Sequence, residues 1–219
     1  MTENKFHISK VASLDVDCQK GFTPLCPDEL PVPEGHLIVD ELNKQAKFAS
    51  KRIGSKDAHP PHALWETTPM FPQFSKVNAA NVDVRWNTHC VVGTWGFELL
   101  EGLPHPIDYD FFVWKGIERD LHPYGACYHD LVQSKSTGLI EYLICNNVKC
   151  VIVGGLATDY CVKTTVMQLV KAGFKVIVNL ASCRGIAQDT ITKAIEHMRV
   201  EGVIFVEEAK QLKEFIERD

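Results

Sequence analysis

The chain has 219 residues, of which 45% are hydrophobic and 23% are charged, a balance typical of a soluble globular protein. The net charge of -5 and the lack of a basic run argue against nucleic acid as a partner. No apolar run approaches the ~20 residues that a membrane-spanning helix needs, and the N-terminus lacks the apolar core of a signal peptide, so we expect a cytoplasmic protein with no membrane partner.

Short apolar segments alternate with helical patterns along the chain. The predicted strands cover residues 11–17, 52–56, 109–115, 150–153, 175–179 and 203–205. The predicted helices cover residues 36–50, residues 136–146, the segment after Asp159, a stretch marked by Ile191, Ile195 and Met198, and a charged C-terminal segment. Strands that alternate with helices predict an α/β fold, with a doubly wound, mostly parallel central sheet and helices on both faces. We expect a single domain over residues 1–219.

Residues 57–108 interrupt this alternation with many prolines, three tryptophans and four histidines. A stretch of this length without clear elements is unusual in a compact domain unless it serves a function. A disordered insertion is the alternative, but disordered segments are poor in aromatic residues. We therefore expect a long loop region that contributes to a functional site.

The eight cysteines are scattered and contain no Cys-x-x-Cys pair. This distribution indicates reduced thiols rather than a disulfide framework. Five of them lie in or beside apolar stretches, where we expect them to be buried: Cys18, Cys90, Cys145, Cys150 and Cys183.

Residues 150–162 (CVIVGGLATDYCV) contain the most informative cysteine. An apolar run ends in two glycines, and Cys161 then precedes residues that recur at helical spacing, which predicts a strand, a tight turn and a helix. A thiol near the helix N-terminus is surrounded by free N–H groups that favour the thiolate and could hold an oxyanion. The alternative is a buried structural cysteine, which is common.

Two further strand ends carry ionisable residues, because Asp17 closes the first predicted strand and Lys115 closes the third. The carboxyl ends of strands in a doubly wound sheet lie at one edge, so both should lie near Cys161. Cys161 would then be a nucleophile, Asp17 its proton acceptor and donor, and Lys115 the cation that balances their charge. Taken singly, Asp17 could instead cap a loop and Lys115 could be solvated.

A candidate metal site is formed by Asp57 and His59, which alternation along an extended chain places on one side, and by His89 from a later loop. A carboxylate with two imidazoles suits one divalent ion, Zn²⁺, Fe²⁺ or Mn²⁺. We interpret His62 as lining the entrance rather than as a further ligand. The remaining histidines that lack such spacing are interpreted as surface or local hydrogen-bonding residues: His7, His105, His122, His129 and His197.

Together these segments resemble the isochorismatase-like cysteine hydrolases and, within them, the nicotinamidases. The resemblance covers most of the chain and rests on several motifs in the family's order. These are VDCQKGF at 16–22, SKDAHP at 55–60, WNTHCVVGT at 86–94, KG at 115–116 and GLATDYCV at 155–162.

The resemblance implies a catalytic triad of Asp17, Lys115 and Cys161 and metal ligation by Asp57, His59 and His89. It also implies a cis peptide bond between Leu156 and Ala157, with the N–H groups of Ala157 and Cys161 as oxyanion donors. The implied reaction is hydrolysis of nicotinamide, or of pyrazinamide-like amides, to the acid and ammonia in NAD salvage. Homo-oligomers are compatible with this family. Candidates for contacts with the substrate ring are Phe22 and Trp86, and further pocket residues could be Tyr124 and Tyr160.

Three alternatives remain open. An amidohydrolase of the same superfamily that acts on another small amide would share the triad but would not need Asp57, His59 and His89. An isochorismatase cleaves a vinyl ether and needs no thiol, so Cys161 argues against it. A binding protein that kept the fold would need neither the triad nor the ligand set.

Overall fold

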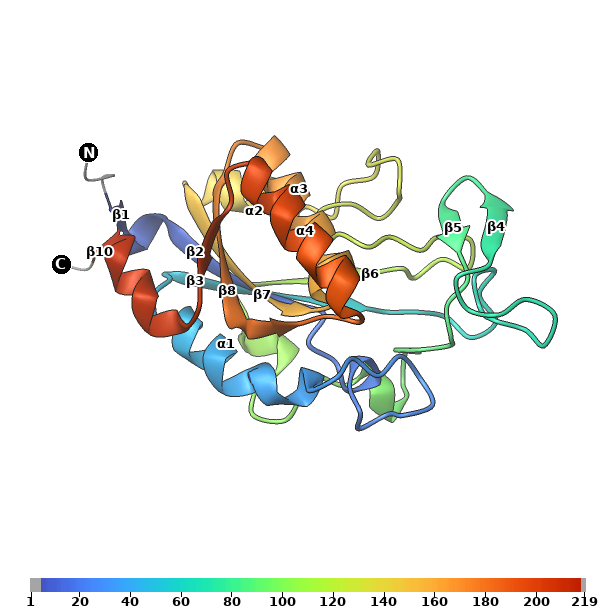
Figure 1. Cartoon of the computed structure of the whole chain (residues 1–219). Helices are drawn as coiled ribbons and strands as arrows, with labels where there is room; N and C mark the ends of the chain where they lie inside the picture. Colours follow the sequence, from blue (N-terminus) through green and yellow to red (C-terminus); the bar gives the residue numbers. More distant parts are fainter. Residues whose placement is uncertain (1–4, 218–219) are drawn as a thin grey trace.

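The computed structural model describes residues 5–217 of the chain. Its centre is a parallel six-stranded sheet in the order β6-β3-β2-β7-β8-β9 (Figure 1). These strands are β2 (Val11–Val16), β3 (Lys51–Asp57), β6 (Phe111–Lys115), β7 (Cys150–Leu156), β8 (Lys175–Arg184) and β9 (Ile204–Val206). From β2 at the middle of the sheet, β3 and β6 extend it toward one edge. From the neighbouring β7, β8 and β9 extend it toward the other edge, which confirms the predicted doubly wound fold.

Helices cover both faces of this sheet (Figure 1). The helix α1 (Val39–Ala46) lies on one face, and α2 (Leu139–Cys145), α3 (Lys163–Lys171) and α4 (Gln188–Val200) lie on the other. Side chains alternate across a strand, so both faces of a central strand are apolar when both are covered. In β7, Val151 and Val153 pack into the core beneath α2, α3 and α4, whereas Cys150 and Ile152 pack on the opposite side.

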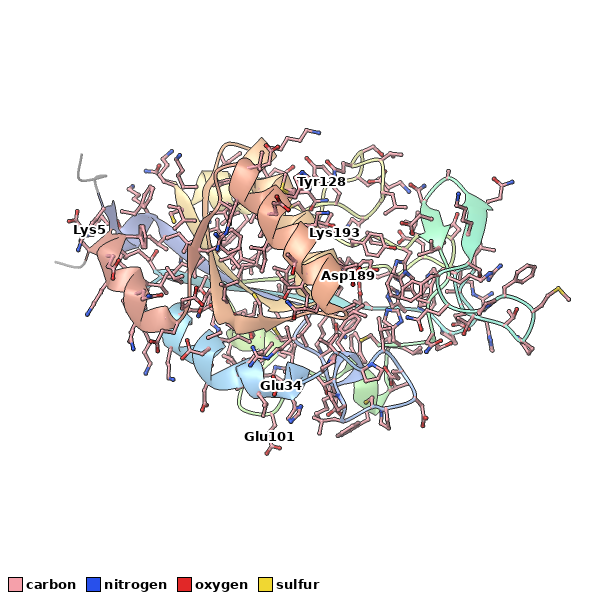
Figure 2. The ribbon with its side chains drawn as sticks, viewed as in Figure 1. Lys5, Glu34, Glu101, Tyr128, Asp189 and Lys193 are labelled. Atoms are coloured by element: carbon pink, nitrogen blue, oxygen red, sulfur yellow. The ribbon has the colours of Figure 1, made fainter. Side chains whose placement is uncertain are left out.

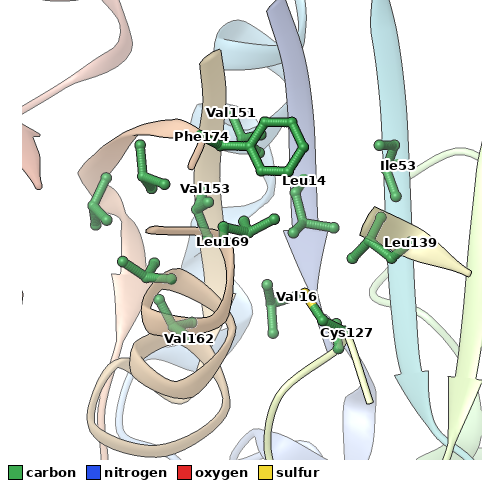
Figure 3. Close-up of a cluster of buried hydrophobic side chains, with 14 of the residues drawn as sticks. Leu14, Val16, Ile53, Cys127, Leu139, Val151, Val153, Val162, Leu169 and Phe174 are labelled. Carbon is green, nitrogen blue, oxygen red and sulfur yellow. The ribbon is translucent and has the colours of Figure 1, made fainter. Parts of the chain in front are cut away.

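The larger core lies between the sheet and α2, α3 and α4. Figure 3 shows Leu14 and Val16 of β2 among side chains that include Leu139 of α2 and Leu169 of α3, and all four are fully buried. On α4 the solvent-facing side carries Asp189 and Lys193 (Figure 2), with 3.9 Å between their charged atoms. This pattern is that of an amphipathic helix with one buried stripe.

The predicted elements differ from the observed ones mainly at their ends. The strands predicted at 150–153 and 175–179 continue to Leu156 and Arg184. β7 can continue beside β2 because Gly155, at φ +135°, lacks a Cβ that would come within 2.1 Å of the Val16 carbonyl oxygen. The predicted C-terminal helix is a 3₁₀ turn, Ala209–Glu214. The helix predicted at 36–50 begins with a 3₁₀ turn, Gly35–Ile38, and ends at Ala46.

The 57–108 segment is folded, so the disordered alternative is wrong. It contains the antiparallel pair β4 (Lys76–Ala79) and β5 (Val82–Val84), which projects at one end of the molecule (Figure 1), and 3₁₀ turns at Trp95–Phe97 and Pro106–Asp108. Trp65 and Trp86 from this segment are buried in a second core beside the carboxyl edge of the sheet. A further small pair joins β1 (Phe6–His7) to β10 (Ile216–Glu217) in parallel.

Within residues 5–217, no helix has the length and apolar character required to cross a bilayer. All eight cysteines are free thiols, as expected. The expectation of burial is wrong for Cys145, which is exposed because it lies at the solvent-facing end of α2.

We predict that Leu143→Ala lowers the free energy of unfolding by about 2–5 kcal/mol, because Leu143 is fully buried on the core-facing side of α2 and the substitution leaves a cavity. The neighbouring residue offers a matched control, since Ile144 is 61% exposed and Ile144→Ala should change the same quantity by less than about 0.5 kcal/mol. Urea unfolding measures both. Equal effects of the two substitutions would contradict this assignment of the buried face.

Candidate active site

Three strand ends bring Asp17, Lys115 and Cys161 together at the carboxyl edge of the sheet. Asp17 follows β2, Lys115 is the last residue of β6, and Cys161 lies in the π-helical turn Thr158–Val162 between β7 and α3. β2 and β7 are neighbours at the point where the strand order reverses, which is where doubly wound sheets bind their ligands. The three residues predicted from the strand ends therefore occupy one site.

Lys115 is the central group of this site. Its Nζ lies 2.9 Å from Asp17 Oδ2 and 3.9 Å from Cys161 Sγ, and it also forms a short ion pair with Asp57 Oδ1. Both Lys115 and Asp17 are fully buried. The second carboxylate oxygen of Asp17 accepts a hydrogen bond of 2.6 Å from Ser55 Oγ of β3, which fixes the orientation of the carboxylate.

Burial and the neighbouring charges set the protonation of the three groups. Burial alone lowers the pKa of Lys115, but the carboxylates of Asp17 and Asp57 outweigh it and hold this pKa well above its usual value. Burial raises the pKa of Asp17, and Lys115 opposes this rise. Burial likewise raises the pKa of the Cys161 thiol far above its usual value, against the opposing charge of Lys115. The expectation of a stabilised thiolate is therefore wrong for the resting site, because desolvation dominates, and Cys161 needs a base.

Gln19 ties the loop after β2 to the end of β3. Its side-chain Nε2 donates hydrogen bonds to the backbone carbonyls of Asp57, at 2.8 Å, and Phe97, at 3.1 Å. Its Oε1 accepts a hydrogen bond of 2.8 Å from the backbone N–H of Asp57. Gln19 is fully buried and positions Asp57. No role for Gln19 was predicted from the sequence, although its position two residues after Asp17 indicated that it lies near the site.

Three buried imidazoles lie beside these groups. His59 follows β3, His89 lies in the long loop segment, and His122 lies in the loop that follows β6. Each offers a ring nitrogen, and these atoms all lie within 4.8 Å of one another. Asp57 lies between the imidazoles and the triad, because its Oδ2 is 3.5 Å from His59 Nε2 while its Oδ1 pairs with Lys115.

The interpretation of His122 as a surface or locally hydrogen-bonded residue is wrong. Its side chain is buried, with 3% exposure, and neither ring nitrogen has a hydrogen-bond partner among residues 5–217. Its place on the loop leaving β6, seven residues after Lys115, was the available signal. His62, in contrast, is exposed and lies outside the imidazole cluster.

The protonation states of the side chains in this cluster favour the binding of a cation. Burial, followed by the nearby His59, lowers the pKa of His89 to about 3. Burial, followed by His59 and His89, lowers the pKa of His122 well below its usual value. Burial would raise the pKa of Asp57, but Lys115 and His59 hold it well below its usual value. Neutral imidazoles and an ionised carboxylate are the forms that bind metals. The buried, unpaired Nε2 of His59 and both ring nitrogens of His122 therefore fit a metal ion.

A small cavity joins the imidazole cluster to the thiol. Its wall includes Cys161, Ala157, His89 and His122, and the aromatic rings of Phe22, Trp86, Tyr124 and Tyr160. The aromatic rings in this wall suit a small, flat molecule. The peptide bond between Leu156 and Ala157 is cis, as the sequence motifs implied.

Hydrogen bonds and ring contacts hold the aromatic wall in place. Trp86 Nε1 donates a hydrogen bond of 3.1 Å to Tyr124 Oη, and Tyr124 Oη donates one of 2.8 Å to Asp83 Oδ1 of β5. Tyr160 meets Trp86 edge-on, with 4.9 Å between the ring centroids. The projecting pair of β4 and β5 thus supports one wall of the cavity.

Comparison with known proteins agrees with this geometry. A family model described as the isochorismatase domain matches residues 12–210. A nicotinamidase of Acinetobacter baylyi is 30% identical over 196 residues, which are 88% of this chain and 90% of that protein. A nicotinamidase of Escherichia coli is 32% identical over 181 residues, 80% of this chain and 83% of that protein.

Solved structures give the same result. A nicotinamidase and pyrazinamidase of Acinetobacter baumanii has a TM-score of 0.84 at 28% identity, over 93% of this chain and 98% of that one. A pyrazinamidase of Pyrococcus horikoshii in complex with zinc has a TM-score of 0.73 at 28% identity, over 90% of this chain and 98% of that one. The family match, the sheet order and the arrangement of the strand-end residues lead to one conclusion: the chain belongs to the isochorismatase family.

Proposed function

We propose that the protein is an amidohydrolase that converts nicotinamide to nicotinate and ammonia, with Cys161 as the nucleophile. The observation that carries this proposal is the single cavity into which both the thiol of Cys161 and the imidazole cluster open. An amide hydrolase needs a nucleophile with a base, and a pyridine amide offers a ring nitrogen that a metal site can recognise. The relatives named as nicotinamidases support this choice of substrate.

The cavity wall selects a flat aromatic amide. Phe22 and Trp86 lie on the wall and provide apolar faces for a heteroaromatic ring. Asp57, His59 and His89 would hold one divalent ion, zinc, iron or manganese, which when bound supplies a Lewis acid for the ring nitrogen. With the ring nitrogen held at one end of the cavity, the carboxamide faces Cys161 at the other.

The acylation half of the reaction follows from the positions of Asp17, Lys115 and Cys161. Asp17 accepts the thiol proton as Cys161 Sγ forms a bond to the amide carbon, and the carbonyl π electrons move to oxygen. The N–H groups of Ala157 and Cys161 stabilise this oxyanion. Asp17 then donates its proton to the amide nitrogen, the C–N bond breaks, and ammonia leaves a thioester on Cys161.

In the second half, Asp17 takes a proton from water, the resulting hydroxide attacks the thioester carbon, and the C–S bond breaks. The acid loses its carboxyl proton to solvent and leaves as nicotinate, and the proton on Asp17 returns to the sulfur. Lys115 keeps Asp17 ionised between these transfers, because its ammonium lies 2.9 Å from the carboxylate. The cycle therefore begins and ends with a neutral thiol, in agreement with the raised pKa of buried Cys161.

The proposed substrate is tested by ammonia release from nicotinamide, pyrazinamide and benzamide by the metal-loaded protein. Nicotinamide and pyrazinamide carry a ring nitrogen in the same position relative to the carboxamide, whereas benzamide has none. We expect release from the first two and much slower release from benzamide. Equal rates for all three amides, or no release from any, would move the substrate to another small amide within the same superfamily.

We predict that Cys161→Ala retains the fold and lowers kcat by a factor on the order of 10⁴ or more, because the covalent step is lost. Ammonia release and a thermal melt measure the two properties. The exposed Cys145 provides the matched control, since Cys145→Ala should leave both unchanged. Turnover by Cys161→Ala at the wild-type rate would rule out the thioester.

We predict that His89→Ala lowers the bound metal per chain and raises KM for nicotinamide, because it removes a ligand that orients the ring. Metal analysis of the purified protein and steady-state kinetics measure the two effects. His105→Ala is the control, since His105 is exposed and lies outside the imidazole cluster. Unchanged metal content in His89→Ala would remove His89 from the ligand set.

A further inference from the structure

We infer that His122 is a direct ligand of the metal ion, so that three imidazoles, His59, His89 and His122, bind the ion beside the carboxylate of Asp57. The inference rests on the proposed metal-assisted function and extends its ligand set. His122 lies in the loop after β6, far in sequence from the Asp-x-His motif and from His89. Its role is therefore a property of the folded chain.

The first support is the convergence of the three side chains. One ring nitrogen from each lies within 4.8 Å of the other two, and all three side chains are buried. The ring of His122 stacks on that of His59, with 5.2 Å between centroids and 14° between planes, and it meets Trp65 edge-on at 4.7 Å. The backbone N–H of His122 donates a hydrogen bond of 3.0 Å to the carbonyl of Asn81, which joins its loop to the β4–β5 turn. The ring is thus held in the cluster by packing.

The second support is the hydrogen bonding of the ring nitrogens. His59 Nδ1 lies 3.0 Å from the Gly116 carbonyl, and His89 Nδ1 lies 2.5 Å from the Asn87 carbonyl. A carbonyl can only accept, so each Nδ1 carries a proton, and Nε2 is the nitrogen left available to a metal ion. Ligating histidines show this pattern, in which the second ring nitrogen donates to a backbone carbonyl.

His122 differs from both neighbours, since neither of its ring nitrogens has a partner among the described residues. Buried polar groups are nearly always hydrogen-bonded, so two unpaired nitrogens on one ring require an explanation. A cation shared with the two neighbouring lone pairs satisfies one of them.

The enlarged ligand set favours particular metals. Three neutral imidazoles with one carboxylate suit the borderline ions Fe²⁺, Co²⁺, Ni²⁺ and Zn²⁺, whereas Mn²⁺ and Mg²⁺ prefer sites dominated by oxygen. The ion would also join three separate loops. One follows β3, one precedes the Trp95–Phe97 turn, and one follows β6. Binding should therefore raise Tm, because the ion binds only the folded chain.

The decisive test counts the imidazoles on the metal. The purified protein is stripped with a chelator and loaded with Co²⁺, and its proton NMR spectrum is recorded, because each cobalt-bound imidazole contributes its own strongly shifted ring resonances. We expect three such sets in the wild type and two in His122→Ala. His62→Ala is the control, since His62 is an exposed histidine three residues after His59, and it should retain three sets.

A competition titration of the same proteins with a chromophoric chelator measures Zn²⁺ affinity. We expect His122→Ala to bind Zn²⁺ at least about tenfold more weakly than the wild type, and His62→Ala to bind as the wild type does. If His122→Ala does not fold, His122→Gln retains a polar side chain of similar volume for both experiments. The wild-type count tests the inference without any variant.

Two sets of shifted resonances in the wild type, or unchanged spectra and affinity in His122→Ala, would overturn the inference. Weaker affinity with only two sets in the wild type would do the same, because His122 would then act without touching the ion. Ammonia release from nicotinamide by the wild type is a separate readout. Three imidazoles without ammonia release would refute the substrate, whereas ammonia release with two imidazoles would refute only the role of His122.

Discussion

The site depends on one buried cation between two carboxylates. Lys115 lies at the end of β6 with its Nζ in contact with Asp17 and Asp57, and none of the three is exposed by more than 1%. A buried charge is costly unless it is paired, so each carboxylate requires the ammonium and the ammonium requires both carboxylates. Asp17 serves the thiol and Asp57 borders the imidazoles, so this arrangement joins the nucleophilic side of the cavity to the metal-binding side.

The same arrangement explains why the thiol is neutral at rest. Two carboxylates near Lys115 leave little positive potential for a thiolate, and burial raises the pKa of Cys161 further. A neutral thiol beside a carboxylate can transfer its proton only when an electrophile arrives, and that carboxylate then carries the proton to the leaving group. The resting site therefore contains no reactive thiolate, and the thiol loses its proton only when the substrate is bound.

The sheet and the triad could be predicted from the sequence because each depends on a local pattern and one general rule. Apolar runs located the strands, and the rule that carboxyl ends of parallel strands share an edge placed Asp17, Lys115 and Cys161 together. His122 and Gln19 could not be found in this way. Their roles depend on which loops fold against each other after the sheet is built, and periodicity carries no information on loop contacts.

The errors have related causes. Cys161 was expected as a thiolate because the helix terminus was considered without its burial, which only the packed structure shows. β7 and β8 were predicted too short because glycines and polar residues follow their apolar runs, although Gly155 is the residue that lets β7 continue beside β2. The β4–β5 pair was not predicted, although its residues alternate between polar and apolar, because its strands have only four and three residues.

The central claim is that amide hydrolysis proceeds through an acyl group on Cys161, and hydroxylamine partitioning tests it most directly. Metal-loaded protein would turn over nicotinamide at increasing hydroxylamine concentrations, and the acid and the hydroxamate would be measured together. A thioester predicts that nicotinohydroxamate forms at the expense of nicotinate, and that Cys161→Ala forms neither. Nicotinate as the sole product at every hydroxylamine concentration would contradict the account, because water would then attack the amide without an acyl-enzyme.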